Sequence, residues 1–248
     1  MKARSVSRCC SGGTIWELAV LVAGLTCTDA SADLVFSGNA FTVEASNDDG
    51  TGLLEVSVAD LTYNPQLNRW TWSLPAPVDI TNGSGDVIAQ VTSANVIYRG
   101  DPQIAFGFSA IAGGSTTTFV IASSLISFPV IPSALANASA GLTLTDGDGN
   151  GGTLQGLHAA GGAYLAEYNG GTDFAELVGP LNAPACGSVS DSDIVPLTAL
   201  GTSVSSMNAW YYFSLTANDL ASGTSNYQIT PEPGAIGFLL VTLLLRRR

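Results

Sequence analysis

Apolar and polar side chains alternate at every second position through much of residues 33–230, whereas helical periodicity is rare. The segments RWTWSL (69–74), QIAFGFS (103–109) and NAWYYFSLTA (208–217) show the alternation most clearly. A period of two is typical of β-strands that have one face in a core. With 46% apolar residues, the chain can bury such a core. The sequence therefore predicts an all-β domain, built as an antiparallel β-sandwich or jelly roll.

Clusters of Gly, Asn, Asp and Pro separate the alternating segments and predict short turns. No linker or internal repeat divides the domain, so one sandwich is favoured over two smaller ones. One short helix is expected at 173–178. Beyond the three segments above, strands are expected at 34–44, 53–61, 87–98, 116–128, 142–145 and 163–168.

Charge is distributed very unevenly along the chain. Between residues 33 and 230, seventeen acidic residues oppose only two basic ones, Arg69 and Arg99, so this stretch has a net charge of about −15. A domain without Lys and with so few Arg cannot neutralise the phosphates of nucleic acid or of an anionic membrane surface. The composition therefore argues against both as partners.

Residues 1–32 are organised like a secretory signal peptide. A basic start precedes an apolar run at 18–25, and the small residues Ala30 and Ala32 follow at the spacing of a cleavage site. We expect a signal helix with cleavage after Ala32; an N-terminal anchor is the alternative, although the apolar run is too short to span a bilayer. The cleaved chain would retain only Cys186 and would hold together without an internal disulfide.

The last eighteen residues have three parts in a fixed order. They are a Pro-Glu-Pro motif, a short apolar run expected to form a helix, and a basic end (Pro231, Glu232, Pro233; 234–245; Arg246, Arg247, Arg248). This tail resembles the PEP-CTERM sorting signal of exported bacterial proteins. Parts of 111–180 also resemble uncharacterised exported proteins that carry this signal.

The resemblance implies a membrane-embedded exosortase as partner and transient membrane contact through the apolar run. A tail that packs on the domain is the alternative. The expected organisation is a signal peptide at 1–32, a sandwich at 33–230, and a sorting and membrane segment at 231–248.

The glycine-rich loop DGDGNG is the sharpest candidate for a metal site. Asp146, Asp148 and Asn150 place oxygen-bearing side chains at alternate positions, as in the first half of a calcium-binding EF-hand loop. The position of the closing bidentate Glu is occupied by Leu157. The sequence thus leaves two readings open, a Ca²⁺ site or a polar hairpin turn.

Aromatic side chains are the candidates for ligand binding. Exposed rings on a sheet can stack against sugar rings, and Trp210 and Tyr212 are the best candidates if Tyr211 and Phe213 face inward. Trp70 and Trp72 also alternate along one strand, where packing between sheets is the more common role.

Signatures of catalysis are missing from the sequence. There is no G-x-S-x-G motif, and His158 is the only histidine, which rules out an HExxH or His-rich metal site. We therefore expect a non-enzymatic protein that is exported to the cell envelope or extracellular matrix, tethered to the membrane by its tail before processing, with a structural or adhesive role. The alternatives are a carbohydrate-binding module for extracellular polysaccharide, and a glycoside hydrolase or lyase that uses two carboxylates.

Overall fold

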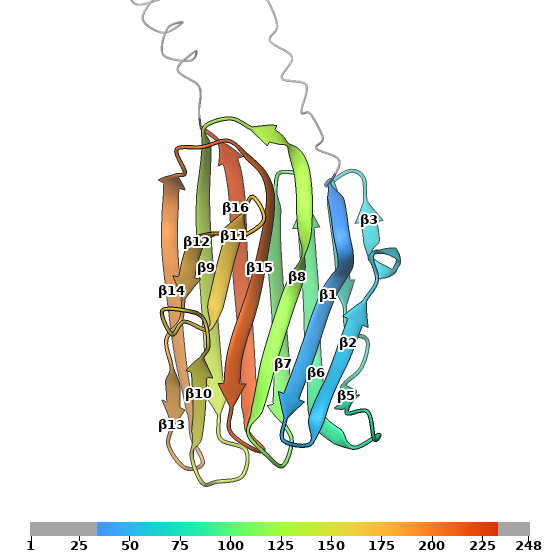
Figure 1. Cartoon of the computed structure of the whole chain (residues 1–248), viewed down its shortest axis with the longest axis vertical. Coiled ribbons are helices and arrows are strands. Elements are labelled where there is room, and N and C mark those ends of the chain that lie inside the picture. Colours follow the sequence, from blue (N-terminus) through green and yellow to red (C-terminus); the bar gives the residue numbers. More distant parts are fainter. Residues whose placement is uncertain (1–33, 233–248) are drawn as a thin grey trace, which may run out of the picture. The chain divides into compact units, whose positions relative to one another are not determined.

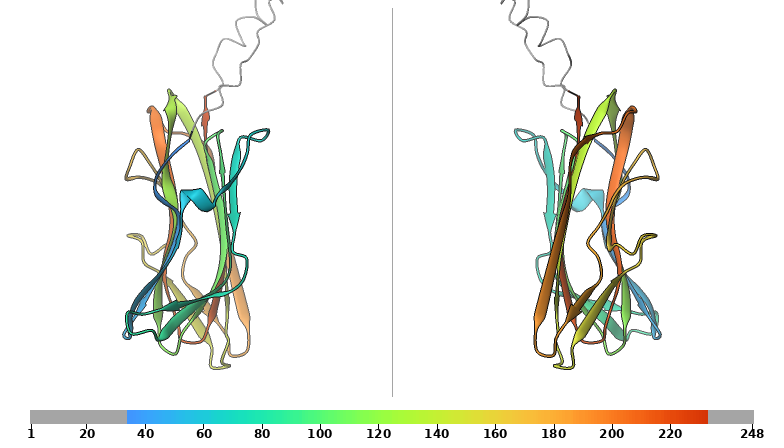
Figure 2. Two further views of the ribbon diagram at one scale, coloured as in Figure 1. Left: turned by 90° about the vertical axis from the view of Figure 1, so that its right-hand side faces the viewer. Right: turned by 90° about the vertical axis from the view of Figure 1, so that its left-hand side faces the viewer.

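The computed structural model describes residues 34–232, which form two antiparallel β-sheets packed face to face (Figure 1, Figure 2). The predictions for 1–32 and for the tail from Pro233 onward lie outside the described residues. Sheet A has the order β12-β11-β15-β8-β1-β2, with β10 on β15 and β13 on β10. Its strands are β1 (Val35–Asn47), β2 (Gly50–Val56), β8 (Thr117–Ile131), β10 (Gly152–Gly156), β11 (Tyr164–Tyr168), β12 (Thr172–Leu177), β13 (Leu181–Ala183) and β15 (Val204–Leu215).

Sheet B has the order β14-β9-β16-β7-β6-β4-β3, with β5 also paired to β6. A single 3₁₀ turn, η1 (Val58–Asp60), follows β2 and leads from sheet A to sheet B. No helix among residues 34–232 has the length and apolar character needed to cross a bilayer. The strands of sheet B are β3 (Thr62–Asn64), β4 (Arg69–Ser73), β5 (Val78–Thr81), β6 (Val87–Arg99), β7 (Gln103–Ala112), β9 (Ala134–Thr145), β14 (Ser188–Ala199) and β16 (Leu220–Pro231).

The predicted β-sandwich is confirmed, and its core lies between the two sheets. Every second residue of the long strands is buried, and large rings from both sheets meet there. Phe106 and Phe108 of sheet B pack against the ring of Tyr211 in sheet A, with centroid distances of 5.6 and 5.0 Å. Trp70 and Trp72 face the same core, where they contact Phe36 and Phe41. The two tryptophans therefore pack between the sheets.

Two local expectations were wrong. The helix expected at 173–178 is a strand, β12, which pairs with β11 across a turn at Asn169 and Gly170. Its Ala175 and Leu177 are buried, so the segment follows the period of a strand. The strand expected at 53–61 ends at Val56, and the 3₁₀ turn η1 follows it. Strand β16 ends at Pro231, the first residue of the Pro-Glu-Pro motif, which aligns with Ala134. Proline is tolerated there because the strand ends at that position.

Tyr98 of β6 joins the two sheets through its buried hydroxyl group. This hydroxyl donates a hydrogen bond to the carbonyl of Ala40 in β1 and accepts one of 2.9 Å from the N–H of Ser124 in β8. The register between β1 and β8 shifts between Ser37 and Phe41, so the ladder is interrupted near these groups. Burial raises the pKa of the Tyr98 phenol, which keeps the donor protonated. Tyr98 thus satisfies two backbone groups that the irregular pairing leaves free.

We predict that Tyr98→Phe lowers the free energy of unfolding by about 1–3 kcal/mol, because a buried N–H and a buried carbonyl lose their partner. Urea denaturation measures the change. Tyr227→Phe is the matched control, since the Tyr227 hydroxyl is buried and has no hydrogen-bond partner among the described residues. The control should be as stable as the wild type or more so, and equal losses in both variants would contradict the role of Tyr98.

Candidate functional site

Three aspartates from two loops meet at one end of the sandwich. Asp146 follows β9, Asp148 lies in the β9–β10 loop, and Asp219 lies between β15 and β16. One carboxylate oxygen from each lies within 4.8 Å of the others. Asp146 and Asp219 are buried, while Asp148 is exposed. We call these three residues the aspartate cluster.

Hydrogen bonds inside the aspartate cluster tie the loops together. Asp146 accepts from the N–H of Gly149 at 3.1 Å and from the N–H of Cys186 in the β13–β14 loop. Asp219 accepts from the N–H of Gly147 at 3.0 Å and from the hydroxyl of Thr216. Burial raises the pKa of the Asp146 carboxyl, but backbone N–H donors led by that of Cys186 outweigh this effect and bring it below its ordinary value of 3.8. The aspartate cluster therefore links neighbouring loops through hydrogen bonds to the carboxylates of Asp146 and Asp219. We call this linkage the clasp.

The structure brings together two of the three predicted metal ligands. Asp146 and Asp148 are adjacent, but the amide nitrogen of Asn150 donates to Asp148 at 2.8 Å. The third carboxylate comes from Asp219, which sequence spacing did not single out because it is far along the chain. Carboxylate oxygens are ligands that a hard cation such as Ca²⁺ prefers. Calcium binding itself stays a prediction.

The predicted aromatic pair lies on the outer face of sheet A. The rings of Trp210 and Tyr212 are nearly parallel, at 6.0 Å and 12°. His158 stands edge-on to Trp210 at 4.6 Å, and burial lowers the pKa of its imidazole, against the opposing effect of Glu176. The Glu176 carboxylate holds the loop of His158 by accepting from the N–H of Ala160 at 2.9 Å. Trp210 and Tyr212 are half-buried as a result, so neither is an open stacking platform.

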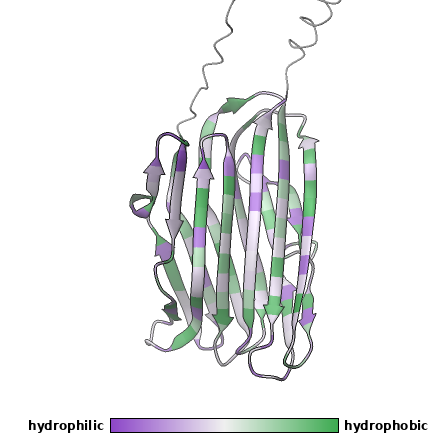
Figure 3. Cartoon of the chain, turned by 180° about the vertical axis from the view of Figure 1, so that it is seen from behind, coloured by the Kyte–Doolittle hydropathy of each residue, from purple (hydrophilic) through white to green (hydrophobic). Residues whose placement is uncertain are grey.

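The outer face of sheet B has a different character, because its strand register aligns short polar residues in rows. Figure 3 shows hydrophilic and hydrophobic residues alternating along strands of the chain seen from behind. In each row, residues of β6, β7, β16, β9 and β14 lie side by side. Hydroxyl groups bond along the rows, as between Ser109 and Ser222, and between Thr143 and Ser190 at 2.8 Å. We call two of these rows the polar face: Ser93, Ser109, Ser222, Thr143 and Ser190; and Asn95, Gly107, Thr224, Gly141 and Ser192.

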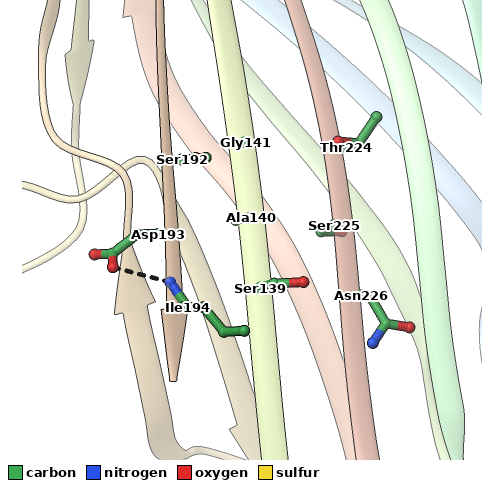
Figure 4. A pocket seen from close by; sticks show the side chains of 9 residues that line it. All are labelled: Ser139, Ala140, Gly141, Ser192, Asp193, Ile194, Thr224, Ser225 and Asn226. Carbon is green, nitrogen blue, oxygen red and sulfur yellow. Dashed lines mark hydrogen bonds between the residues drawn. The ribbon is translucent and has the colours of Figure 1, made fainter. Parts of the chain in front are cut away.

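Shallow hollows lie in the polar face because its second row contains Gly107 and Gly141. One hollow extends over Gly141 and is bordered by Ser139, Ser192, Thr224 and Asn226 (Figure 4). A second one includes both Gly107 and Gly141. Hydroxyl and amide groups, together with Asp193 and Ile194 of β14, thus surround a surface that a flat ligand can approach closely.

Acidic residues are absent from the middle of sheet B. Its four long central strands, β6, β7, β9 and β16, contain no Asp or Glu, although residues 34–232 hold seventeen of them. The edge strand β14 carries Asp191 and Asp193, which border the hollows. On sheet A, Glu44, Glu55 and Glu167 lie on β1, β2 and β11, while the two central strands β8 and β15 are free of acids. The polar face is therefore an uncharged surface on a strongly acidic domain.

No family model and no curated protein sequence matches the chain. Among solved structures, TmCBM61 in complex with β-1,4-galactotriose aligns with a TM-score of 0.27 and 9% identity, covering 52% of this chain and 71% of that one. A structure of infectious bursal disease virus, Gx strain, aligns with a TM-score of 0.17 and 9% identity, covering 88% of each chain. Likenesses this weak carry no argument about function.

We predict that Ca²⁺ raises the melting temperature of the protein through the aspartate cluster. A ligand at about one hundred times its Kd stabilises the folded state by about 2.7 kcal/mol, or roughly 5–10 °C in a domain of this size. Asp148→Asn should abolish the rise, whereas Asp48→Asn in the β1–β2 turn should retain it. A wild-type melting temperature that does not respond to Ca²⁺ would leave the cluster as a clasp only.

The clasp itself predicts a pH dependence. Because the folded-state pKa of Asp146 lies below 3.8, its carboxylate stabilises the fold fully above that pH, and this contribution is lost as pH falls through the lower folded-state pKa. Asp146→Asn should melt earlier than the wild type at pH 7, and the difference should shrink in acid below pH 3.8. Melting curves across pH measure this difference, and a gap that stays constant into acid would contradict the clasp.

Proposed function

We propose that this chain is an exported, non-catalytic protein of the cell envelope or extracellular matrix, and that its β-sandwich adheres to polysaccharide through the polar face. The observation that carries the proposal is the rows of hydroxyl and amide groups on four strands without acidic residues. Saccharides present hydroxyl groups in every direction, and they are bound by donors and acceptors fixed on a rigid scaffold. A β-sheet provides such a scaffold.

Export and sorting rest on the two ends of the sequence. The signal-peptide pattern ends at Ala30 and Ala32, and the tail carries the Pro-Glu-Pro motif with an apolar run and a basic end. An exosortase is accordingly the proposed processing partner. The acidic composition without Lys suits a secreted protein that binds neither nucleic acid nor an anionic membrane surface.

An adhesive role is favoured over glycoside hydrolysis or lyase chemistry. A hydrolase needs a carboxyl group whose pKa is raised so that it can donate a proton. The aspartate cluster does not fit this requirement, since the pKa of Asp146 is lowered. Asp219 is buried, and its carboxylate accepts hydrogen bonds from Gly147 and Thr216. His158 is packed against aromatic rings, and burial lowers its pKa.

The half-buried pair of Trp210 and Tyr212 is the competing location for a saccharide. Its aromatic rings would supply stacking, whereas the polar face would supply hydrogen bonds. The polar face is favoured because two hollows lie on it, while the loop of His158 packs against the aromatic pair. Substitutions on the two faces separate these locations.

We predict that Gly141→Val weakens polysaccharide binding at least tenfold without harming the fold. A Cβ at this position would meet its nearest neighbours at 3.7 Å, which is ordinary contact, and the added methyl groups would fill the hollow. Valine also suits a strand better than glycine, so the melting temperature should stay constant or rise. Binding is measured on immobilised polygalacturonate, alginate, dextran and cellulose.

Thr42→Val on the outer face of sheet A is the matched control and should bind like the wild type. If Trp210→Ala abolishes binding while Gly141→Val leaves it intact, the saccharide site lies on sheet A and the polar face is excluded. Wild-type protein that binds none of the four polymers contradicts an adhesive role toward these polysaccharides.

A further inference from the structure

The only two cationic side chains among residues 34–232 lie next to each other. Arg69 of β4 and Arg99 of β6 are directly opposite in the antiparallel register, which puts their Cα atoms about 4.5–5.5 Å apart. Their neighbours Trp70 and Tyr98 face the core, so both arginines point to the outer face of sheet B. They lie on the same side of the sheet as the polar face.

This placement of two like charges lowers the stability of the folded domain. Like charges directly opposite each other on neighbouring strands repel and destabilise a sheet. Seventeen acidic residues are available in the domain, yet the structure gives neither arginine an ion pair within residues 34–232. The Nε–H of Arg69 is buried and has no hydrogen-bond partner there. Two like charges therefore lie at directly opposite strand positions, and one of them has a buried donor without a partner.

Amide side chains continue this pair across sheet B. In one row, residues of β3, β4, β6, β7, β16 and β9 lie side by side, and each of them can donate hydrogen bonds. This arginine row runs parallel to the polar face, four residues along β6 from Asn95, and the row that contains Ile97 and Ala105 lies between them. The arginine row consists of Asn64, Arg69, Arg99, Gln103, Gln228 and Asn137.

We propose that Arg69 and Arg99 bind carboxylate groups of an acidic polysaccharide that lies across the polar face. The planar guanidinium group matches a carboxylate through two parallel hydrogen bonds, which an ammonium group cannot reproduce. A carboxylate between the two arginines would also remove their mutual repulsion. The inference rests on the proposed function and names its ligand class, a uronic-acid polymer rather than a neutral one.

The remaining surface of the domain opposes a polyanion at long range. At 0.15 M salt the Debye length is about 8 Å, so distant acids are screened while direct contacts to the two arginines persist. The four central strands carry no acid that would face the bound polymer. The charge pattern thus permits an anionic ligand on this face and discourages it elsewhere.

The test compares the full chain with Arg69→Gln, Arg99→Gln and the double variant at 0.15 M salt. The probes are polygalacturonate, its methyl-esterified form, dextran and dextran sulfate. Gln155→Glu on β10 is the control, because it makes the same change in net charge on the other sheet. We expect the wild type and the control to bind polygalacturonate alike, the single variants to bind about tenfold more weakly, and the double variant to fall to the level of the esterified polymer.

Arg99→Lys keeps the charge but loses the planar fork, so it should bind polygalacturonate more weakly than the wild type. The melting temperatures of the glutamine variants should equal or exceed that of the wild type, because a repulsive pair is removed. A melting temperature that falls in the double variant would assign the arginines a structural role and overturn the proposal.

The other outcomes distinguish a failure of the arginine proposal from a failure of the adhesive role. If the wild type and the double variant bind polygalacturonate and its ester equally well, the arginine proposal fails while the adhesive role stands. If dextran sulfate binds more tightly than polygalacturonate, the assignment to carboxylates is overturned. If the wild type binds none of the four probes, the proposal fails together with adhesion to polymers of these classes.

Discussion

Burial of the two inner sheet faces against each other is the constraint on which the rest of the structure depends. Aromatic rings such as Phe108, Tyr211 and Phe213 pack across the space between the sheets, and each buried side chain of this size stabilises the fold by about 1.5–3 kcal/mol. Cys186 is the one free cysteine described, so packing has to hold this region together without a disulfide. Because the inner faces supply stability, the outer faces are free to differ.

The outer faces of the two sheets differ in their charge and in whether a loop covers part of them. Sheet A carries glutamates within its strands, and a loop anchored by Glu176 covers part of its aromatic pair. The long central strands of sheet B carry hydroxyl, amide and glycine positions in aligned rows, and the domain's two arginines lie opposite each other near one end. Acidic residues are thus absent from the four central strands of sheet B, and two like charges lie opposite each other on the same sheet at a cost to stability. This asymmetry supports a binding role for sheet B.

The fold class could be predicted from the sequence because alternation is strong where side chains are large, as around Trp70 and Trp72. It is weak where both faces carry small residues, and strands β14 and β16 escaped prediction for that reason. The segment of β12 was mistaken for a helix because it is short and lies between glycine turns.

The candidate sites, like the fold, could be predicted only in part from the sequence. Asp146 and Asp148 could be paired by spacing, whereas Asp219 joins them only through the loop arrangement. Arg69 and Arg99 were recognised as the only cations of the domain, but their placement opposite each other depends on the pairing of β4 with β6. Alternation and turn geometry set the register within a pair of strands, but they do not tell which strands pair.

The most direct test of a polyuronate-binding face on sheet B is an NMR titration of the full chain with oligogalacturonate at 0.15 M salt. The arginine Nε–Hε signals are followed together with the backbone amides, after assignment with the Arg69→Gln and Arg99→Gln variants. The account predicts that the signals of Arg69 and Arg99 shift together with the amides of β7, β9 and β16, at one common affinity. Shifts confined to β15 around Trp210, or signals that do not move, would contradict it.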